Sequence, residues 1–263
     1  MDYQGICFSV KEIARRAGDF IREERKKLSE EDVETKSPAS FVTYVDKTSE
    51  KDIVSALKKL LPEAGFITEE GTASYSGEKY KWVIDPLDGT TNYIHGITPY
   101  SVSIALMEGN EIVLGVVYEI GLDEIFYAWK GSPAYLNGKE IKVSGASMHE
   151  QCLIATGFPY YAFDRIDGYI EVLRFLMKNT RGLRRLGSAA VDLAYVASGR
   201  FDAFYEHALH SWDIAAGVFI IQQAGGRIAD FSGGKNWLFG GELVAANEKY
   251  FNKFLGVIKE HLG

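Results

Sequence analysis

The sequence predicts a mixed α/β (α+β) fold, a layered sandwich of helices and sheets with an antiparallel first-half sheet and a mixed second-half sheet. Apolar runs at 100–108, 111–119 and 123–130 are separated by glycine-containing turns, which is typical of an antiparallel meander. After about residue 150, strand-like and helix-like segments alternate instead. We therefore expect two packed subdomains, 1–150 and 151–263, in one structural unit.

The elements of the first half follow from hydrophobic periodicity and from turn residues. Apolar residues at helical spacing predict a helix over 6–27. The polar stretch 29–50 contains a Ser-Pro pair and predicts a mobile loop, which runs into a helix over about 46–61 that ends before Pro62. Besides the meander, short apolar runs predict strands at 65–68, 81–85 and 137–144.

The second half reads as strands and amphipathic or buried helices in turn. One of these helices, at 188–199, begins with a serine cap at Ser188 and ends at a glycine. The predicted strands are 152–156, 201–206 and 243–246. The predicted helices are 166–178, 188–199, 212–226 and a last helix from 247.

Composition and charge restrict the function. The 263 residues are 46% hydrophobic, which allows a large core, and the formal net charge of -7 argues against a general binder of nucleic acid or anionic membranes. A small phosphorylated substrate stays possible, because a bound metal reverses the local field. The two cysteines, Cys7 and Cys152, form no CxxC pair, and no leader or membrane-length apolar run is seen. We expect a reduced, cytoplasmic protein.

The stretch WVIDPLDGTTNYIHG at 82–96 concentrates unusual chemistry. Asp85 and Asp88 flank a proline, and with the Leu87 carbonyl they offer three hard oxygen donors, which suit Mg²⁺. Gly89-Thr90-Thr91 resembles a helix start, whose free N–H groups hold phosphate. A metal site beside an anion site suggests metal-assisted hydrolysis of a phosphoester.

Other acidic residues also stand at element ends, and each alone has a simpler explanation. Asp213 opens a predicted helix and is typical of an N-cap. Glu69 and Glu70 follow a strand and are typical of a solvated strand end, and Asp85 before proline is a common turn opener. Asp46 ends the polar loop. Their combination is harder to explain by local structure, since strand ends and helix starts are where such folds present functional groups.

The motif DPLDGTTN, with TEE before it and WDIAAG after it, resembles the inositol monophosphatase family of magnesium-dependent, lithium-sensitive phosphatases. The resemblance covers nearly the whole chain, from the loop at Lys36 to the last helix. It implies a layered αβαβα sandwich with the site between its halves, about two to three Mg²⁺ ions per site, and a homodimer. The first subdomain would bind metal and phosphate.

The resemblance also implies roles for single residues. Glu69, Asp85 and the Leu87 carbonyl would bind a first Mg²⁺, and Asp85, Asp88 and Asp213 a second, with a weaker ion near Glu69. Asp46, Thr90 and Glu69 would be catalytic, orienting a water for in-line attack. The loop at Lys36 would close over the metals. The implied phosphate- and substrate-binding residues are Asp88, Gly89, Thr90, Thr91, Gly187, Ser188, Ala189, Glu206 and Asp213.

Several alternatives remain open at this level. Glu206 either accepts from the substrate's ring or is a solvated strand-end carboxylate, and Glu70 either supports the metal site or is simply exposed. Thr91 and Trp212 point to the branch that hydrolyses inositol 1-phosphate. The same signature also fits fructose-1,6-bisphosphate or another sugar phosphate, with cations to come from Arg165, Arg184 or Arg185. A non-enzymatic alternative is a protein partner in RNA processing or transcription.

Overall fold

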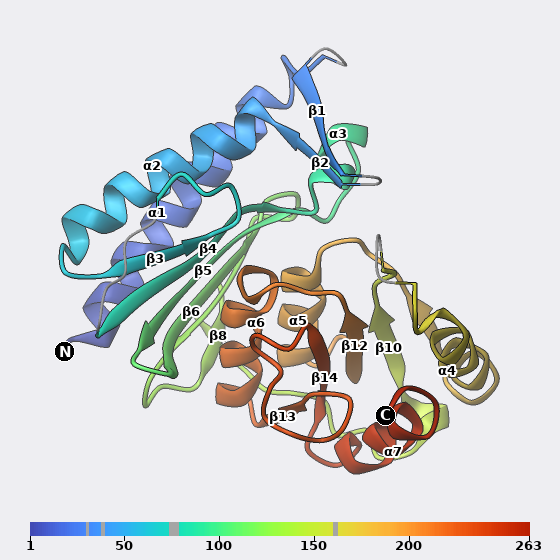
Figure 1. Ribbon diagram of the computed structural model, residues 1–263. Coiled ribbons are helices and arrows are strands. Elements are labelled where there is room, and N and C mark those ends of the chain that lie inside the picture. The colour runs from blue at the N-terminus through green and yellow to red at the C-terminus, as the bar shows by residue number, and fades with distance from the viewer. Residues whose placement is uncertain (30–31, 38–39, 74–78, 160–162) are drawn as a thin grey trace.

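Helices and sheets alternate in five layers in the computed structural model (Figure 1), which describes residues 1–29, 32–37, 40–73, 79–159 and 163–263, with the backbone alone at 35–37 and 40–41. Helices α1 (Tyr3–Glu24) and α2 (Tyr44–Leu60) cover one face of a first sheet. Helices α5 (Ala189–Ala197) and α6 (Ser211–Gln223) lie between this sheet and a second one. Helices α4 (Ile166–Asn179) and α7 (Phe251–Leu262) cover the far face. The predicted αβαβα sandwich is confirmed.

The first sheet has seven strands in the order β3-β4-β5-β6-β7-β8-β9. Only its first pair, β3 and β4, is parallel, and every later pair is antiparallel, as the meander predicted. The strands are β3 (Gly65–Thr68), β4 (Tyr80–Asp88), β5 (Ser101–Glu108), β6 (Glu111–Glu119), β7 (Glu124–Trp129), β8 (Ala134–Leu136) and β9 (Lys139–Ile141).

The second sheet is mixed, as predicted, with five strands in the order β11-β10-β12-β14-β13. Strand β10 is parallel to both of its neighbours, whereas β14 is antiparallel to both of its own. The strands are β10 (Leu153–Thr156), β11 (Gly182–Arg184), β12 (Ala203–His207), β13 (Gly226–Ala229) and β14 (Glu242–Asn247). A short 3₁₀ helix, η2 (His149–Gln151), precedes β10.

The predicted loop over 29–50 was wrong for the described residues 33–37 and 40–50, and its positions 30–31 and 38–39, with the proline of the Ser-Pro pair, lie outside the described residues. Strands β1 (Val33–Ser37) and β2 (Ser40–Thr43) pair as an antiparallel hairpin there, and α2 begins directly afterwards at Tyr44. Cross-strand bonds satisfy the backbone groups of this polar segment, and such pairing leaves no hydrophobic periodicity in the sequence. Thr43 then caps α2 by accepting from Val45 N at 3.1 Å.

Other differences also have local causes. Asn137 and Gly138 both have positive φ and form the hairpin turn between β8 and β9, so the strand predicted over 137–144 begins only at Lys139 and ends at Ile141. The last helix begins at Phe251, not 247, because the Asn247 side chain accepts from Tyr250 N in a turn before it. The sequence did not predict β8, β11 or β13. The short helix α3 (Thr90–His95) has Gly89 as its N-cap, so the helix start expected at Gly89-Thr90-Thr91 is confirmed.

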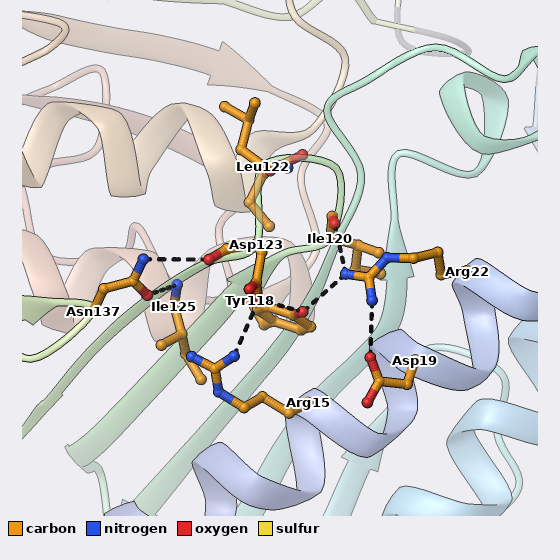
Figure 2. Close-up of polar contacts among 10 residues, drawn as sticks. Arg15, Asp19, Arg22, Tyr118, Ile120, Leu122, Asp123, Ile125 and Asn137 are labelled. Carbon is orange, nitrogen blue, oxygen red and sulfur yellow. Dashed lines mark hydrogen bonds and ion pairs between the residues drawn. The ribbon is translucent and has the colours of Figure 1, made fainter.

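The long helix α1 is fixed to the first sheet by close packing and by polar contacts (Figure 2). Arg22 donates to the Tyr118 hydroxyl at 3.0 Å and to the Ile120 carbonyl at 2.9 Å. A Cβ at Gly18 would lie 2.4 Å from the Tyr118 ring, so glycine is needed where the helix crosses β6. The described part of the chain contains no helix that is both long and apolar enough to cross a membrane.

Candidate active site

Asp85 and Asp88 lie at the C-terminal end of strand β4 in the first sheet. The strand continues to Asp88, beyond the predicted end at residue 85, and its pairing with β5 shifts register between the two aspartates. The bend predicted at Asp85-Pro86-Leu87-Asp88 is therefore an irregularity within the strand and not a separate turn. Asp85 is 2% exposed, and its Oδ1 accepts from Leu87 N at 2.9 Å.

Asp88 joins the first sheet to helix α5. Its Oδ2 accepts from the Ser188 hydroxyl and from Ala190 N, the latter at 2.8 Å. Ser188 is also the N-cap of α5. The start of this helix, predicted to face substrate, therefore first serves to hold a carboxylate in place.

Asp46 lies in the first turn of α2, within a capping box. Its Oδ2 accepts from the backbone N and from the hydroxyl of Thr43, at 2.8 and 2.7 Å. Its Oδ1 faces the Thr90 hydroxyl at 3.1 Å, and the same hydroxyl is 3.0 Å from the Leu87 carbonyl. The structure thus brings Asp46, Thr90 and the end of β4 together, although they are up to 44 residues apart.

The segment after β3 carries Glu69 and is held by a residue that sequence reasoning missed. Glu69 N donates to the Ile84 carbonyl at 3.3 Å, which places Glu69 beside β4. The buried Glu50 of α2 accepts from Glu70 N at 2.7 Å and from Thr72 N at 2.8 Å. Nothing in the sequence marks Glu50, because it is one acidic residue among several on an amphipathic helix.

Asp213 stands in the first turn of α6 and caps it, since its Oδ2 accepts from His210 N at 2.7 Å. The N-cap itself is His210, so Asp213 is the third helical residue of a capping box and not the N-cap that the sequence suggested. The His210 ring stacks on Trp212 with centroids 4.6 Å apart. Asp213 also faces the other acidic residues, so capping and participation in the acidic cluster are compatible.

The carboxyl groups influence one another strongly. Burial raises the pKa of Asp85 well above its usual range, and Glu69, Asp88 and Asp213 raise that pKa further. Burial raises the pKa of Asp88 to about 6, although its bonds from Ser188 and Ala190 counteract the shift. The pKa of Asp213 is also well above its usual range, through burial and then through Asp88. These four residues are named the acidic cluster below: Glu69, Asp85, Asp88 and Asp213.

The acidic cluster fits a divalent cation by the chemistry of its donors. Hard carboxylate oxygens are the ligands that Mg²⁺ prefers, and a dication offsets both the burial and the mutual repulsion that raise the pKa values of these aspartates. Within the described ranges, no three His, Cys, Asp or Glu side chains form a preassembled ligand set. The four groups are thus electrostatic neighbours that offer suitable donors, not a closed cage.

Gly89 forms a tight junction between three segments. It has φ of 90°, and a Cβ there would lie 3.0 Å from the Pro99 carbonyl oxygen and 3.2 Å from that of Gly187. Asn92 of α3 donates to the Pro99 and Leu186 carbonyls at 2.8 and 2.7 Å. The start of α3, with Thr90 and the partly buried Thr91, is therefore fastened beside the segment 187–189.

A cavity of about 280 Å³ lies next to these groups. Predicted site residues in its wall are Glu69, Asp88, Gly187, Ser188, Ala189, Glu206 and Asp213. Its wall also contains Phe158, Arg185 and Asp192, of which the sequence analysis had proposed only Arg185. A larger hollow of about 850 Å³ lies between α1 and α2, away from the acidic cluster, so size alone does not locate the site. The side chain of Lys36 lies outside the described residues, and so does its predicted closure over the metals.

Comparison with known proteins decides the family. Residues 3–262 match the model of the inositol monophosphatase family. The chain belongs to the inositol monophosphatase family. The Nus factor SuhB of Pseudomonas aeruginosa is 43% identical over 254 residues, which cover 95% of this chain and 94% of that protein. An inositol-1-monophosphatase of Mesorhizobium japonicum is 38% identical over 250 residues, with 95% and 94% covered.

Solved structures of this family have the same architecture. The extragenic suppressor protein SuhB of Bartonella henselae superimposes with a TM-score of 0.92 at 37% identity, covering 98% of this chain and all (100%) of that one. An IMPase of Thermotoga maritima gives 0.89 at 34% identity, with 98% of both chains covered. Family membership supports a phosphatase of the inositol monophosphatase superfamily.

Glu206 borders the same cavity near the end of β12. Burial raises its pKa to about 8, the nearby Arg185 opposes this rise, and Asp88 adds to it. The residue is not a fully solvated strand-end carboxylate. Its side chain forms part of the cavity wall.

The three arginines that could bind a second phosphate are not equivalent. Arg185 lines the cavity, and its guanidinium lies 5.6 Å from the centre of the Phe158 ring. Arg184 donates to the Leu183 carbonyl and lines a different hollow. Arg165 pairs with Glu242 at 2.6 Å. Of these three, Arg185 alone borders the candidate site.

Proposed function

We propose that the protein is a Mg²⁺-dependent phosphomonoesterase that hydrolyses inositol 1-phosphate or a similar sugar phosphate by attack of an activated water. The observation that carries this proposal is the acidic cluster beside a cavity, in which burial and then the neighbouring carboxyl groups raise the pKa of Asp85, Asp88 and Asp213. Such a cluster is costly for a fold and suits a site for divalent metal.

The acidic cluster and the Leu87 carbonyl would hold about two to three Mg²⁺ ions, with Glu69, Asp85 and Leu87 at one position and Asp85, Asp88 and Asp213 at another. When bound, Mg²⁺ lowers the pKa of a coordinated water and neutralises charge on the phosphate oxygens. The fixed positions of Asp85, Asp88 and Asp213 support this role. Each side chain already accepts a backbone N–H bond that limits its motion.

Asp46 and Thr90 would orient the attacking water. Asp46 Oδ2 is held by Thr43, and Asp46 Oδ1 and the Leu87 carbonyl are both within reach of the Thr90 hydroxyl. A hydroxyl has one proton, so Thr90 donates to one of the two and its oxygen can accept from a water. Burial raises the pKa of Asp46 to about 6, a value suited to proton transfer near neutrality.

The alcohol would occupy the cavity, and the phosphate would lie beside it, next to the start of α3. The N–H groups of Gly89 and Thr90 at the start of α3 would hold the phosphate, with Thr91 supporting the geometry beside the metal. The segment Gly187-Ser188-Ala189, Glu206 and Asp213 would line the alcohol side, as their place in the cavity wall supports. Asp88 would border both parts, because it reaches from β4 to α5.

The direct test is phosphate release with Mg²⁺ from inositol 1-phosphate, fructose-1,6-bisphosphate, 3'-phosphoadenosine 5'-phosphate and histidinol phosphate, with and without EDTA. The proposal requires EDTA-sensitive turnover that is strongest on inositol 1-phosphate or another sugar monophosphate. Activity that EDTA leaves unchanged would contradict the metal assignment. Preference for the bisphosphate would favour the second enzymatic candidate, for which Arg185 in the cavity wall is the supporting observation.

A role in transcription or RNA processing is the non-enzymatic candidate. It is favoured by relatives of 43% and 38% identity that carry the name Nus factor SuhB. Absence of turnover on the whole panel, together with capture of transcription proteins in a native pull-down, would make it the leading one. We further propose that the protein is cytoplasmic, which two buried free cysteines support. We also propose that it forms a homodimer, and sedimentation velocity would test this.

A further inference from the structure

Asp192 is a polar exception on a buried apolar helix. It lies on α5 one turn beyond the cap Ser188, and its neighbours Val191 and Leu193 are buried core residues. The side chain is 1% exposed, and its Oδ1 has no hydrogen-bond partner among the described residues. A buried acceptor without a donor costs folding free energy, so its position needs an explanation beyond packing.

The carboxyl group with this unpartnered oxygen belongs to the cavity wall. Asp192 lines the same cavity as Glu206 and Arg185, and it comes from a different element than Glu206. The charged groups that act on it are Glu206, Asp88 and Arg185, two carboxylates and one guanidinium. Besides members of the acidic cluster, the cavity wall thus presents two carboxyl groups from two elements and one guanidinium group.

Two acceptors on different elements select for a ligand with two donors. A hydroxyl that donates to Glu206 leaves Asp192 unsatisfied unless a second hydroxyl of the same molecule reaches it. A site built to hydrogen-bond a substrate hydroxyl discriminates against an analogue that lacks it, because buried polar groups are then left unpaired. An aryl or simple alkyl phosphate has no such hydroxyls.

We propose that Asp192 is a specificity-determining residue whose carboxyl group accepts a hydrogen bond from a hydroxyl of the leaving alcohol, alongside Glu206. The substrate class is then the phosphomonoesters of polyols with at least two free hydroxyl groups. This inference rests on the proposed phosphatase function, and it adds to that function a second recognition point on α5.

The experiment compares kcat/KM for inositol 1-phosphate and for p-nitrophenyl phosphate in wild type, Asp192→Ala and Asp192→Asn. Loss of one hydrogen bond corresponds to roughly a tenfold effect, so Asp192→Ala should lower the preference for inositol 1-phosphate about that much. Asp192→Asn keeps an acceptor oxygen and should fall between wild type and alanine. It also keeps the test open if the alanine variant does not fold.

The matched control is Asp202→Asn. Asp202 is also a buried aspartate, but it lies outside this cavity and accepts from Leu153 N and from the Ser144 hydroxyl. We expect this control to lower the melting temperature and to leave the ratio of the two kcat/KM values unchanged. An unchanged ratio in both Asp192 variants would overturn the proposal and assign Asp192 a purely structural role.

A second readout separates this proposal from the proposed function. If the wild type turns over neither substrate, the phosphatase proposal fails, and binding of myo-inositol is then measured by calorimetry with Mg²⁺ and inorganic phosphate present. Wild-type binding that weakens in Asp192→Ala would still support recognition of a polyol by Asp192. No binding to the wild type would overturn the inference.

Discussion

Gly157 lies directly against the carboxyl group of Glu206: a Cβ atom at position 157 would be 1.9 Å from Glu206 Oε1. Gly157 does not have a positive φ, so glycine is required there by the lack of space for a side chain and not by the backbone conformation. The end of β10 therefore leaves room for one particular placement of a side chain on the neighbouring strand β12. The position of Glu206 in the cavity depends on the absence of a methyl group next to it.

Gly157→Ala should displace Glu206 and lower kcat/KM for inositol 1-phosphate several-fold more than for p-nitrophenyl phosphate. The added methyl group occupies the place of the carboxylate, which must rotate away from the alcohol side. Steady-state kinetics on the two substrates measure this. Gly145→Ala is the matched control, because a Cβ there meets nothing within 4 Å and the backbone φ is not positive. Equal effects of both substitutions would show that the position of Glu206 is irrelevant to specificity.

The raised pKa of Glu206 predicts a pH-dependent stability. Its pKa is about 8 in the folded protein against a usual value of 4.5, so between these values the folded state retains a proton that the unfolded state has lost. Stability therefore falls as pH rises through this interval, and the loss is complete above pH 8. Glu206→Gln removes the titrating group.

Urea unfolding in EDTA at several pH values measures that effect. The free energy of unfolding of Glu206→Gln relative to wild type should increase steadily from about pH 5 to about pH 8 and then level off. Because Glu206 is partly exposed to the cavity, solvent reduces the size of the change but not its sign. A difference between the two proteins that does not vary with pH would mean that Glu206 titrates normally.

The sequence predicted the long elements well because their signals are local. Helix α1 and the meander β5–β7 follow from hydrophobic periodicity. The β8–β9 turn is an exception, because the sequence analysis placed it inside a strand although Asn137-Gly138 is a strong turn signal. The hairpin β1–β2 lies in a polar stretch without hydrophobic periodicity, and the short β11 depends on pairing with β10 across helix α4, so neither has a clear local signal.

The same distinction explains the candidate site. Asp85, Asp88 and Asp213 stand in motifs, so a resemblance could name them. Glu50 and Asp192 belong to no motif, and each becomes visible only when packing shows what its carboxyl group faces. Arg184 and Arg185 are adjacent in the sequence and could not be ranked there, although in the structure only the second of these two borders the cavity.

Asp88→Asn should lower kcat by orders of magnitude while the fold survives. The amide oxygen can still accept from Ser188 and Ala190 N, so the link between β4 and α5 is kept, but the negative charge offered to Mg²⁺ is lost. Circular dichroism and kcat at saturating Mg²⁺ measure the two expectations separately. Near-normal turnover would contradict the assignment of Asp88 as a metal ligand.

Thr90→Val should lower kcat by about ten- to a hundredfold with little change in KM, because it removes the hydroxyl that joins Asp46 to the Leu87 carbonyl and nearly preserves the side-chain volume. Thr90→Ser restores the hydroxyl and should recover most of the activity. Single-substrate kinetics of the two variants provide the comparison, with the melting temperature as a check on folding. If valine changed KM and left kcat intact, Thr90 would contact the substrate in its ground state and would have no part in orienting the water. If serine failed to recover activity, the γ-methyl group of Thr90, and not its hydroxyl, would be the group that matters for turnover.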